Sequence, residues 1–276
     1  MAIKNVDPVA FRLGSLSVRW YGIFITIAIL VGYVVACLNG KKRGIKLDFM
    51  LEVFLWAVPL AILFARLSYV LFHPKDFAVH SWSDFGRIFA IREGGISILG
   101  AIPGGALGVF CACKRNKVPI SYVLDVIAPG LILGQALGRW GNWANQELYG
   151  MAVTNEKWQF FPYAVFIENG VDYGWFQATF FYEMVLNLIG FVILMLVFRK
   201  SKRNLMTFMT YMCWYMAVRA VMEVFRDDAV SAGGIRVGVL GCAIAAGISL
   251  IITVLIYVGK IRTGTPEPLT MEEKTK

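Results

Sequence analysis

The chain contains 276 residues, of which 58% are hydrophobic and 16% are charged, and its formal net charge is +9. Soluble domains carry about 25% charged residues, so this composition excludes an ordinary soluble domain and predicts an all-α integral membrane protein. Because Lys and Arg accumulate in the cytoplasmic loops of membrane proteins, the positive charge does not require a nucleic-acid partner.

Seven apolar segments are long enough to cross a bilayer as helices, which takes roughly 17–25 residues each. They cover about residues 20–39, 49–72, 94–113, 118–138, 179–198, 205–225 and 237–259. The loops after the first, third and fifth segments are basic: Lys41, Lys42, Arg43 and Lys46; Lys114, Arg115 and Lys117; Arg199, Lys200, Lys202 and Arg203. Every second loop is therefore expected in the cytoplasm, with the N-terminus outside and the C-terminus inside.

The segments belong to a single expected domain. We predict one transmembrane domain over residues 1–262, with a small extracytoplasmic cap over about 139–178 that is rich in aromatic side chains. Aromatic rings of this kind gather at membrane interfaces. The cytoplasmic tail, residues 263–276, contains Pro266, Pro268 and alternating charges, a composition typical of disorder.

The third apolar segment is rich in small residues. It combines Pro103 with Gly94, Gly95, Gly100, Gly104, Gly105 and Gly108. Small residues let two membrane helices approach closely, which is one interpretation. A bent or broken helix that lines a cavity is the other.

Cysteine and histidine indicate neither a disulfide framework nor a metal centre. The five cysteines lie in or at the cytoplasmic ends of apolar segments, and the two histidines, His73 and His80, fall in one loop. No pair of cysteines is expected in an outside loop, and two histidines are too few for a metal site.

Polar side chains gather at one depth, in the outer half of the predicted spans. They come from five elements far apart in the sequence: Tyr21, Arg66, Arg139 with Asn142 and Glu147, Tyr182 with Glu183, and Arg219 with Glu223 and Arg226. The last three are spaced i, i+4 and i+7, so they share one helix face. Ionisable groups inside a span are costly and usually face a cavity or a partner. Asp125 lies in the inner half of the fourth span and is expected to bond a neighbouring helix.

Each of these residues also has a purely structural interpretation. Arg219 and Glu223 can form a buried pair that locks helices, and Arg66 can extend to the outer headgroups. Glu147 can be a solvated residue of the cap, while Asn142 and Asn145 can serve as helix caps and turn formers.

The cluster favours an anion as its ligand. Four arginines, Arg66, Arg139, Arg219 and Arg226, face three acids, and a guanidinium group presents a planar fork that matches phosphate oxygens. In the outer leaflet the available phosphate is a phospholipid headgroup. Such a site can bind lipid, or it can stabilise the charge that grows on a leaving phosphate.

The chain resembles the prolipoprotein diacylglyceryl transferase family. The stretch from Gly138 to Gly150 carries the resemblance, with Arg139, Asn142, Asn145 and Glu147 at the positions of the family signature. Further matches follow the same order along residues 18–230: Trp20-Tyr21-Gly22, Arg66-x-x-Tyr69, Gly94-Gly95-Ile96-Ser97, Asp125-x-x-Ala128-Pro129, Tyr182-Glu183 and Arg219-x-x-x-Glu223-x-x-Arg226.

The resemblance implies a lipid-transfer reaction in the bacterial cytoplasmic (inner) membrane, as part of lipoprotein biosynthesis. A diacylglyceryl group moves from phosphatidylglycerol to the thiol of a lipobox cysteine in a prolipoprotein signal peptide, and glycerol phosphate leaves. No metal or soluble cofactor is implied. The implied catalytic residues are Arg139, Arg219, Glu223 and Tyr21. The implied donor-binding residues are Arg139, Asn142, Asn145, Glu147, Gly150, Arg66 and Arg226.

The chain also departs from the family pattern. Leu99 stands where the family usually has His or Tyr, Gln177-Ala178 replaces His-Pro, and Val239 replaces a polar Gln. Leucine cannot accept a proton, although a cationic site lowers the pKa of a thiol and can make a dedicated base dispensable. A divergent paralogue with another donor or acceptor, or one that binds lipid without turnover, is therefore the second hypothesis. A transporter or channel is the third, but such proteins often contain repeated halves, which this sequence lacks.

Overall fold

The computed structural model describes residues 7–14, 16–77, 95–225, 231–232 and 235–265. His80, Gly94, Arg226 and the segment 266–276, which includes Pro266 and Pro268, lie outside these residues. The chain divides into two compact units, one from residues 1–39 and 124–266 and one centred on residues 40–123. Each unit is described by itself.

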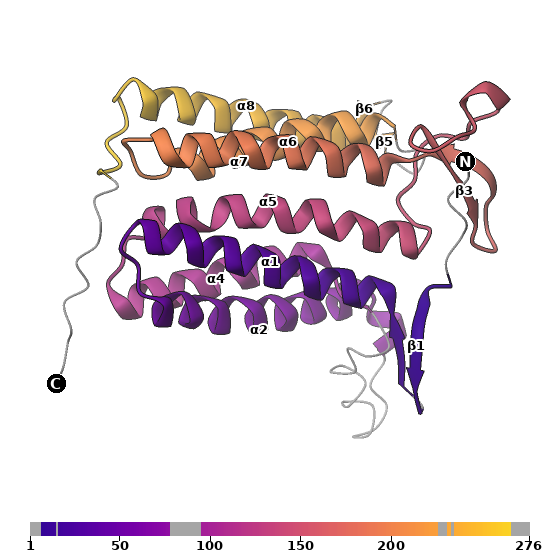
Figure 1. Ribbon diagram of the computed structural model, residues 1–276, viewed down its shortest axis with the longest axis horizontal. Coiled ribbons are helices and arrows are strands. Elements are labelled where there is room, and N and C mark those ends of the chain that lie inside the picture. The colour runs from indigo at the N-terminus through magenta and orange to yellow at the C-terminus, as the bar shows by residue number, and fades with distance from the viewer. Residues whose placement is uncertain (1–6, 15, 78–94, 226–230, 233–234, 266–276) are drawn as a thin grey trace. The chain divides into compact units, whose positions relative to one another are not determined.

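Seven α-helices account for most of the described residues (Figure 1). They are α1 (Trp20–Lys42), α2 (Leu47–Phe72), α4 (Ile98–Asn116), α5 (Ile120–Ala144), α6 (Thr179–Lys200), α7 (Met206–Val224) and α8 (Val237–Tyr257). All of them except α7 are long and apolar enough to cross a membrane. The helical fold and six candidate spans therefore agree with the predicted membrane protein.

Short strands and 3-10 turns connect these helices. The hairpin β1 (Val9–Leu13) with β2 (Leu16–Arg19) precedes α1, β3 (Ala164–Glu168) pairs with β4 (Tyr173–Gln177), and β5 (Ser231–Ala232) pairs with β6 (Ile235–Arg236). All three pairs are antiparallel. The 3-10 turns are η1 (Pro74–Phe77) and η4 (Glu156–Trp158).

The start of α4 and the end of α5 differ most from the sequence-based expectation. α4 begins at Ile98 instead of residue 94, because Gly95 has a φ of +72° and Ser97 is extended. α5 continues to Ala144, six residues beyond the expected end, so Arg139 and Asn142 lie on a helix and not in the cap. Gly141 is accepted inside α5 because a Cβ atom there would lie 2.9 Å from the ring of Tyr21.

The glycines of α4 allow close packing against α2. A Cβ atom at Gly100 would lie 2.1 Å from the carbonyl oxygen of Phe64, and one at Gly104 would lie 2.4 Å from that of Leu60. Gly108 continues the same row against Ala57 and Trp56. α4 runs without interruption through Pro103, so the structure supports the close-packing interpretation of this segment.

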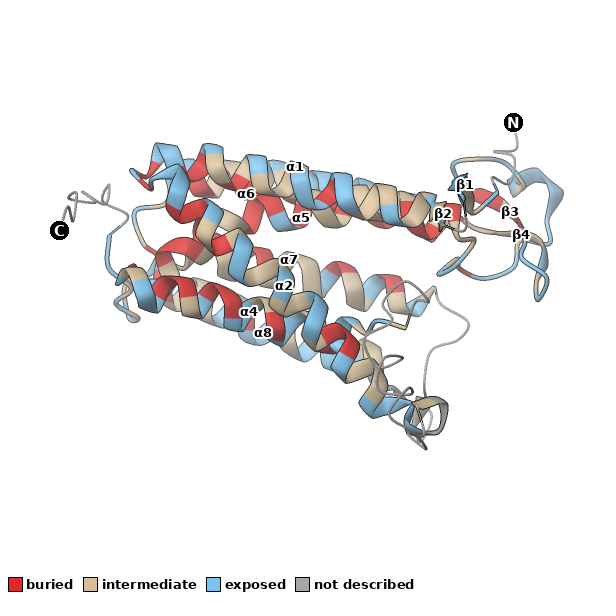
Figure 2. Cartoon of the chain, turned by 90° about the horizontal axis from the view of Figure 1, so that it is seen from below, coloured by how far each residue is buried: buried red, intermediate tan, exposed pale blue. Residues whose placement is uncertain are grey.

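In the other unit, α5 is the most buried helix. Its inward residues include Val126, Ala128, Ile132 and Ala136 (Figure 2). Gly130 of α5 meets Gly32 of α1 so closely that a Cβ atom on either would lie within 2.8 Å of the other's carbonyl oxygen.

Asp125 confirms its predicted structural role. Its Oδ1 accepts a hydrogen bond of 2.8 Å from the backbone N–H of Phe208, in the first turn of α7. The first N–H groups of a helix have no partner within the helix, so a carboxylate from a neighbouring helix stabilises that end.

Large apolar side chains cover the outside of the helices. Leu30, Val34 and Leu38 on α1 and Ile248 and Ile251 on α8 are among the many that remain exposed (Figure 2). Soluble proteins rarely expose contiguous apolar surface of this kind. A hydrocarbon environment satisfies these faces.

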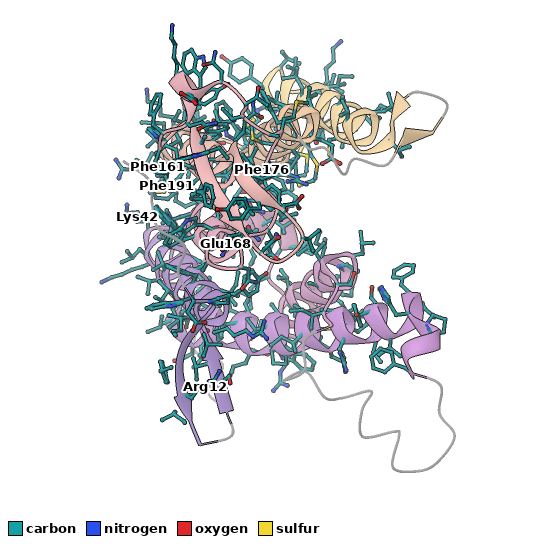
Figure 3. All side chains as sticks on the ribbon, turned by 90° about the vertical axis from the view of Figure 1, so that its right-hand side faces the viewer. Arg12, Lys42, Phe161, Glu168, Phe176 and Phe191 are labelled. Atoms are coloured by element: carbon teal, nitrogen blue, oxygen red, sulfur yellow. The ribbon has the colours of Figure 1, made fainter. Side chains whose placement is uncertain are left out.

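An aromatic cluster joins the β3–β4 hairpin to the ends of α5 and α6. Val165, Ile167, Ala178 and Phe180 form its buried centre, with partly buried rings such as Phe161 and Phe176 packed against them (Figure 3). This cluster fixes the chain that follows α5, which carries several of the predicted site residues.

The described part of the C-terminal tail is tied to the loop after α6. The backbone N–H of Asn204 donates to the carbonyl oxygen of Gly264 at 3.1 Å, and its side-chain amide donates to that of Thr265 at 3.3 Å. Ordered contacts therefore reach Thr265, two residues into the tail predicted to begin at residue 263. All five cysteines are free.

Candidate functional site

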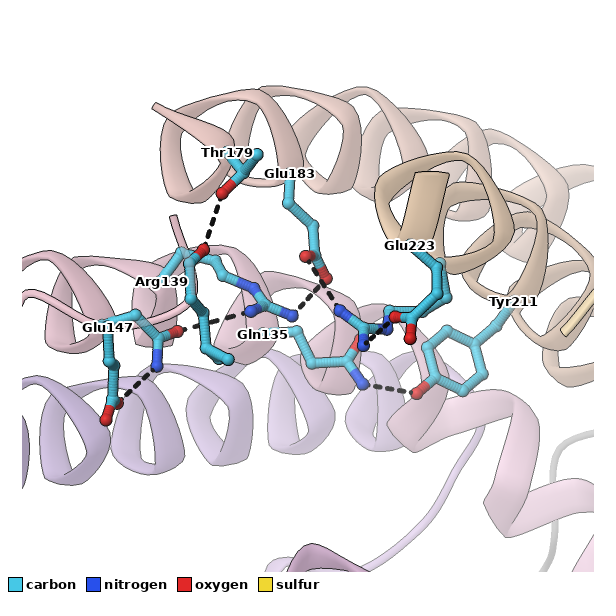
Figure 4. A network of polar contacts seen from close by, with 10 residues as sticks. Gln135, Arg139, Glu147, Thr179, Glu183, Tyr211 and Glu223 are labelled. Carbon is cyan, nitrogen blue, oxygen red and sulfur yellow. Dashed lines mark hydrogen bonds and ion pairs between the residues drawn. The ribbon is translucent and has the colours of Figure 1, made fainter. Parts of the chain in front are cut away.

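Arg139 starts a network of polar contacts near the end of α5 (Figure 4). One terminal nitrogen pairs with the Oε1 atom of Glu183 on α6, and the other donates to the Oδ1 atom of Asn142 at 3.4 Å. Asn142 lies one helical turn further on and donates from Nδ2 to Oε1 of Glu147 at 2.8 Å. The helical continuation of α5 thus places Arg139 and Asn142 on one face.

Glu183 links two arginines from different helices. Its second oxygen, Oε2, lies 3.3 Å from a terminal nitrogen of Arg219 on α7. The residue is 3% exposed. A buried carboxylate is costly unless it is paired and hydrogen-bonded, and two guanidinium groups meet that need. Glu183 therefore holds Arg139 and Arg219 at one point.

The network continues along α7 to Glu223. The second terminal nitrogen of Arg219 lies 3.5 Å from Oε2 of Glu223, which is four residues further along the same helix. Both side chains are partly exposed. The chain of contacts runs from Glu147 through Asn142, Arg139, Glu183 and Arg219 to Glu223, so the structure brings together side chains that the sequence placed at one depth.

Tyr21 joins this network from the first turn of α1. Its ring packs on Gly141 of α5, with a gap that leaves no room for a Cβ atom. Its hydroxyl group lies within electrostatic range of Glu147 and Arg139. Gly141, which has no side chain, therefore leaves the space that the ring of Tyr21 occupies.

A second set of polar groups lies beside the network, about one helical turn before Arg139 on α5. The sequence analysis did not predict these groups. Gln135, four residues before Arg139, donates to the hydroxyl oxygen of Tyr211 at 2.8 Å (Figure 4). The Tyr215 hydroxyl group lies within electrostatic range of Glu183, Arg139 and Arg219. The i−4 spacing of Gln135 from Arg139 is a signal in the sequence that would have revealed it.

Arg66 lies in the unit centred on residues 40–123, with its own partners. A terminal nitrogen donates to the carbonyl oxygen of Gly95 at 2.8 Å, and the guanidinium group lies 5.0 Å from the ring centre of Phe77. The residue is only 3% exposed, so its guanidinium group lies inside this unit among these partners. Leu99, in the first turn of α4, is 66% exposed.

Asn145 and Gly150 belong to the turn that follows α5. A Cβ atom at Gly150 would lie 2.8 Å from Cγ2 of Thr179, and the Gly150 backbone N–H donates to the carbonyl oxygen of Gln177. Thr179 in turn donates from its hydroxyl group to the carbonyl oxygen of Leu148 at 2.6 Å. Gly150 therefore seats this turn against the start of α6. The side-chain oxygen of Asn145 is buried and has no hydrogen-bond partner among the described residues.

The charge balance of the network differs from the expected arginine excess. Arg139 and Arg219 face Glu147, Glu183 and Glu223, while Arg66 lies in the other unit and Arg226 lies outside the described residues. Each guanidinium group has five N–H donors. The contacts with Asn142, Glu183 and Glu223 occupy only some of these donors, so both arginines retain donors for a further oxygen ligand.

Comparison with protein families matches residues 8–256 to the family described as prolipoprotein diacylglyceryl transferase. Relatives named phosphatidylglycerol–prolipoprotein diacylglyceryl transferase span nearly the same length. One from Listeria monocytogenes is 35% identical over 275 residues, covering 99% of this chain and 96% of its own. One from Clostridium botulinum is 39% identical over 237 residues, covering 85% and 91%. One from Halalkalibacterium halodurans is 37% identical over 228 residues, covering 82% and 78%.

Proposed function

Because the chain belongs to the prolipoprotein diacylglyceryl transferase family, we propose that it transfers a diacylglyceryl group from phosphatidylglycerol to a prolipoprotein. The acceptor is the thiol of the lipobox cysteine. Its sulfur forms a bond to the glyceryl carbon while the bond from that carbon to the phosphate oxygen breaks. Glycerol phosphate leaves with the electron pair, the thiol proton is released, and a thioether remains.

The observation that carries this proposal is the Arg139–Glu183–Arg219 bridge. It presents two guanidinium groups, from two helices, in one partly exposed polar network. Guanidinium groups bind phosphate oxygens through paired N–H donors. They also stabilise the negative charge that grows on the leaving phosphate, which is the demanding part of this displacement.

The neighbouring residues would shape the donor site around that phosphate. Asn142 orients Arg139 and Glu147 through its two side-chain bonds. Gly150 fixes the turn after α5, in which Asn145 also lies, and Tyr21 and Glu223 support the network from α1 and α7. We further propose that Arg66 and Arg226 take part in donor binding, for which the resemblance of their motifs is the support.

We place the protein in the bacterial cytoplasmic membrane as a multi-pass protein, with seven spans in one transmembrane domain and its site toward the outer leaflet. Six helices of suitable length and composition support the first point. The basic residues at the ends of α1, α4 and α6 support an outside N-terminus and a cytoplasmic C-terminus.

Leu99 favours a second candidate function. An exposed leucine stands at the start of α4, where the family resemblance places a side chain able to accept a proton. A divergent paralogue that uses another donor or acceptor, or that binds phospholipid without turnover, would not need that group.

A transfer assay separates the two. Purified protein in detergent is mixed with phosphatidylglycerol and a lipobox peptide, and the peptide is examined by mass spectrometry. A diacylglyceryl mass gain on the cysteine, lost in Arg139→Ala, is the expected result. Binding of phosphatidylglycerol by the folded protein without any mass gain would support the second candidate and contradict the first.

A further inference from the structure

Glu223 meets the first turn of α8 at Gly238. A Cβ atom at Gly238 would lie 2.7 Å from Oε1 of Glu223 and 3.0 Å from its Cδ atom. Contacts this short leave no room for any side chain at residue 238 while the carboxylate keeps its place. Gly238 therefore leaves the space that the Glu223 carboxylate occupies.

The carboxylate sits between two sources of positive charge. Its other oxygen, Oε2, lies 3.5 Å from Arg219, and the N-terminal turn of α8, which begins at Val237, carries a partial positive charge from its unpaired N–H groups. Both groups attract the carboxylate of Glu223 toward its present position. A shift away from α8 would alter the contact with Arg219.

We propose that Gly238 is a positioning residue for the phosphate site, acting through Glu223. Arg219 contacts both Glu223 and Glu183, and Glu183 also contacts Arg139. A displaced Glu223 would therefore shift the guanidinium groups of both arginines. This inference rests on the proposed function, since it assigns those arginines to the donor phosphate.

The requirement for glycine is specific to this position of α8. At Gly241, one turn further along the same helix, no atom of the described residues lies within 4 Å of where a Cβ atom would be, and the same holds for Gly247. General helix packing therefore does not explain Gly238. The end of a glutamate side chain can rotate, so an added methyl group would move the carboxylate and leave the helices in place.

The test compares Gly238→Ala with the matched control Gly241→Ala, each alone and combined with Glu223→Ala. The kinetic constants for phosphatidylglycerol are measured in the transfer assay. Donor binding is measured on the same variants as the gain in melting temperature on adding phosphatidylglycerol. The binding measurement tests the positioning even if the chain binds donor without turnover.

We expect Gly238→Ala to fold with a melting temperature close to that of the wild type, but to lower kcat/KM or donor affinity by about tenfold, as for other residues in direct contact. Gly241→Ala should match the wild type. In the Glu223→Ala background, Gly238→Ala should have no further effect, because the group that it displaces is gone.

Two results would overturn the positioning role. One is a Gly238→Ala protein equal to the wild type in kinetics and binding. The other is an equal loss in both backgrounds, which would mean that Gly238 acts through packing alone. A wild-type protein that binds phosphatidylglycerol but transfers nothing contradicts the proposed transferase instead, and the binding cycle still decides the role of Gly238.

Discussion

Glu183 places one carboxylate between two guanidinium groups in a chain that is otherwise largely apolar. Removing either partner of a buried ion pair leaves an uncompensated charge, which costs several kcal/mol. The three side chains therefore act as a unit, and we expect a phosphate bound at the proposed site to meet two arginines that Glu183 already holds in place.

Asn142 offers a direct test of how that geometry is maintained. Asn142→Asp keeps the oxygen that accepts from Arg139 but replaces the amide that donates to Glu147 with a second carboxylate oxygen. Loss of such a bond costs about 1–3 kcal/mol, so kcat/KM should fall by about 10- to 100-fold. The transfer assay measures this change in kcat/KM for phosphatidylglycerol.

Asn155→Asp is the control for this substitution, because Asn155 caps the exposed turn η4 and aspartate caps equally well. Unchanged kcat/KM in Asn142→Asp would show that the Asn142–Glu147 bond has no part in the site.

Leu99 allows a gain of function to be tested. It is exposed at the start of α4, so Leu99→His should fold without repacking. A general base contributes about 10²–10⁴-fold to a reaction that needs one, so a rise of tenfold or more in kcat is expected. Leu99→Gln, polar but unable to accept a proton, is the control. An unchanged or lower kcat in Leu99→His would mean that no base is missing.

The sequence predicted most of the residues in the polar network but not the contacts between them. The i, i+4 spacing predicted the neighbours Arg219 and Glu223. The central place of Glu183 depends on the register of α6 against α5 and α7, which helical periodicity within one segment does not contain. The spacing of Gln135 from Arg139 could have identified Gln135, but not its partner Tyr211, which lies on another helix.

The contact between α2 and α4 depends on glycines that let the two helices pack closely. Gly104→Ala would force a Cβ atom to within 2.4 Å of the Leu60 carbonyl oxygen. Backbone cannot move aside cheaply, so a loss of about 1–3 kcal/mol in the free energy of unfolding is expected. The melting temperature in detergent measures this loss.

The next residue provides the matched control. A Cβ atom at Gly105 would make only an ordinary contact, 3.7 Å from the Cβ atom of Ala61. Gly105→Ala should therefore keep the wild-type melting temperature. Equal stability of the two variants would contradict the close packing of these helices.

Element boundaries show where apolar patterning fails as a guide. The apolar run of the fourth segment stops near residue 138, whereas α5 continues to Ala144. Polar residues can continue a helix when other elements satisfy them, as Glu183 does for Arg139. Hydropathy reports the length of a segment in the membrane and not the length of the helix, so the apolar run did not predict the last six residues of α5.

The proposed orientation of the protein in the membrane can be tested by labelling single cysteines. In a chain freed of its five cysteines, Val171→Cys probes the exposed tip between β3 and β4, and Lys200→Cys probes the basic end of α6. A membrane-impermeant maleimide should label the first in intact spheroplasts and the second only after lysis. The reverse pattern would invert the proposed topology.

The whole-chain prediction succeeded because two independent signals agreed. Long apolar segments predicted a helical membrane protein, and six helices meet the requirement for a span. The motif from Gly138 to Gly150 predicted the family, and the family match over residues 8–256 confirms it. The sixth predicted span, residues 205–225, coincides with α7, which is helical but carries Arg219 and Glu223 among its apolar residues.

We propose that Arg139 and Arg219 form one phosphate site, held together by Glu183. A double-mutant cycle with Arg139→Lys and Arg219→Lys tests it most directly, because lysine keeps the charge but not the planar fork. Each change alone should lower kcat/KM for phosphatidylglycerol by about 100-fold, and the double variant should be little worse than either, since residues of one network are not additive. A double variant whose loss equals the product of the two single losses would mean that the arginines act independently, and it would contradict the claim.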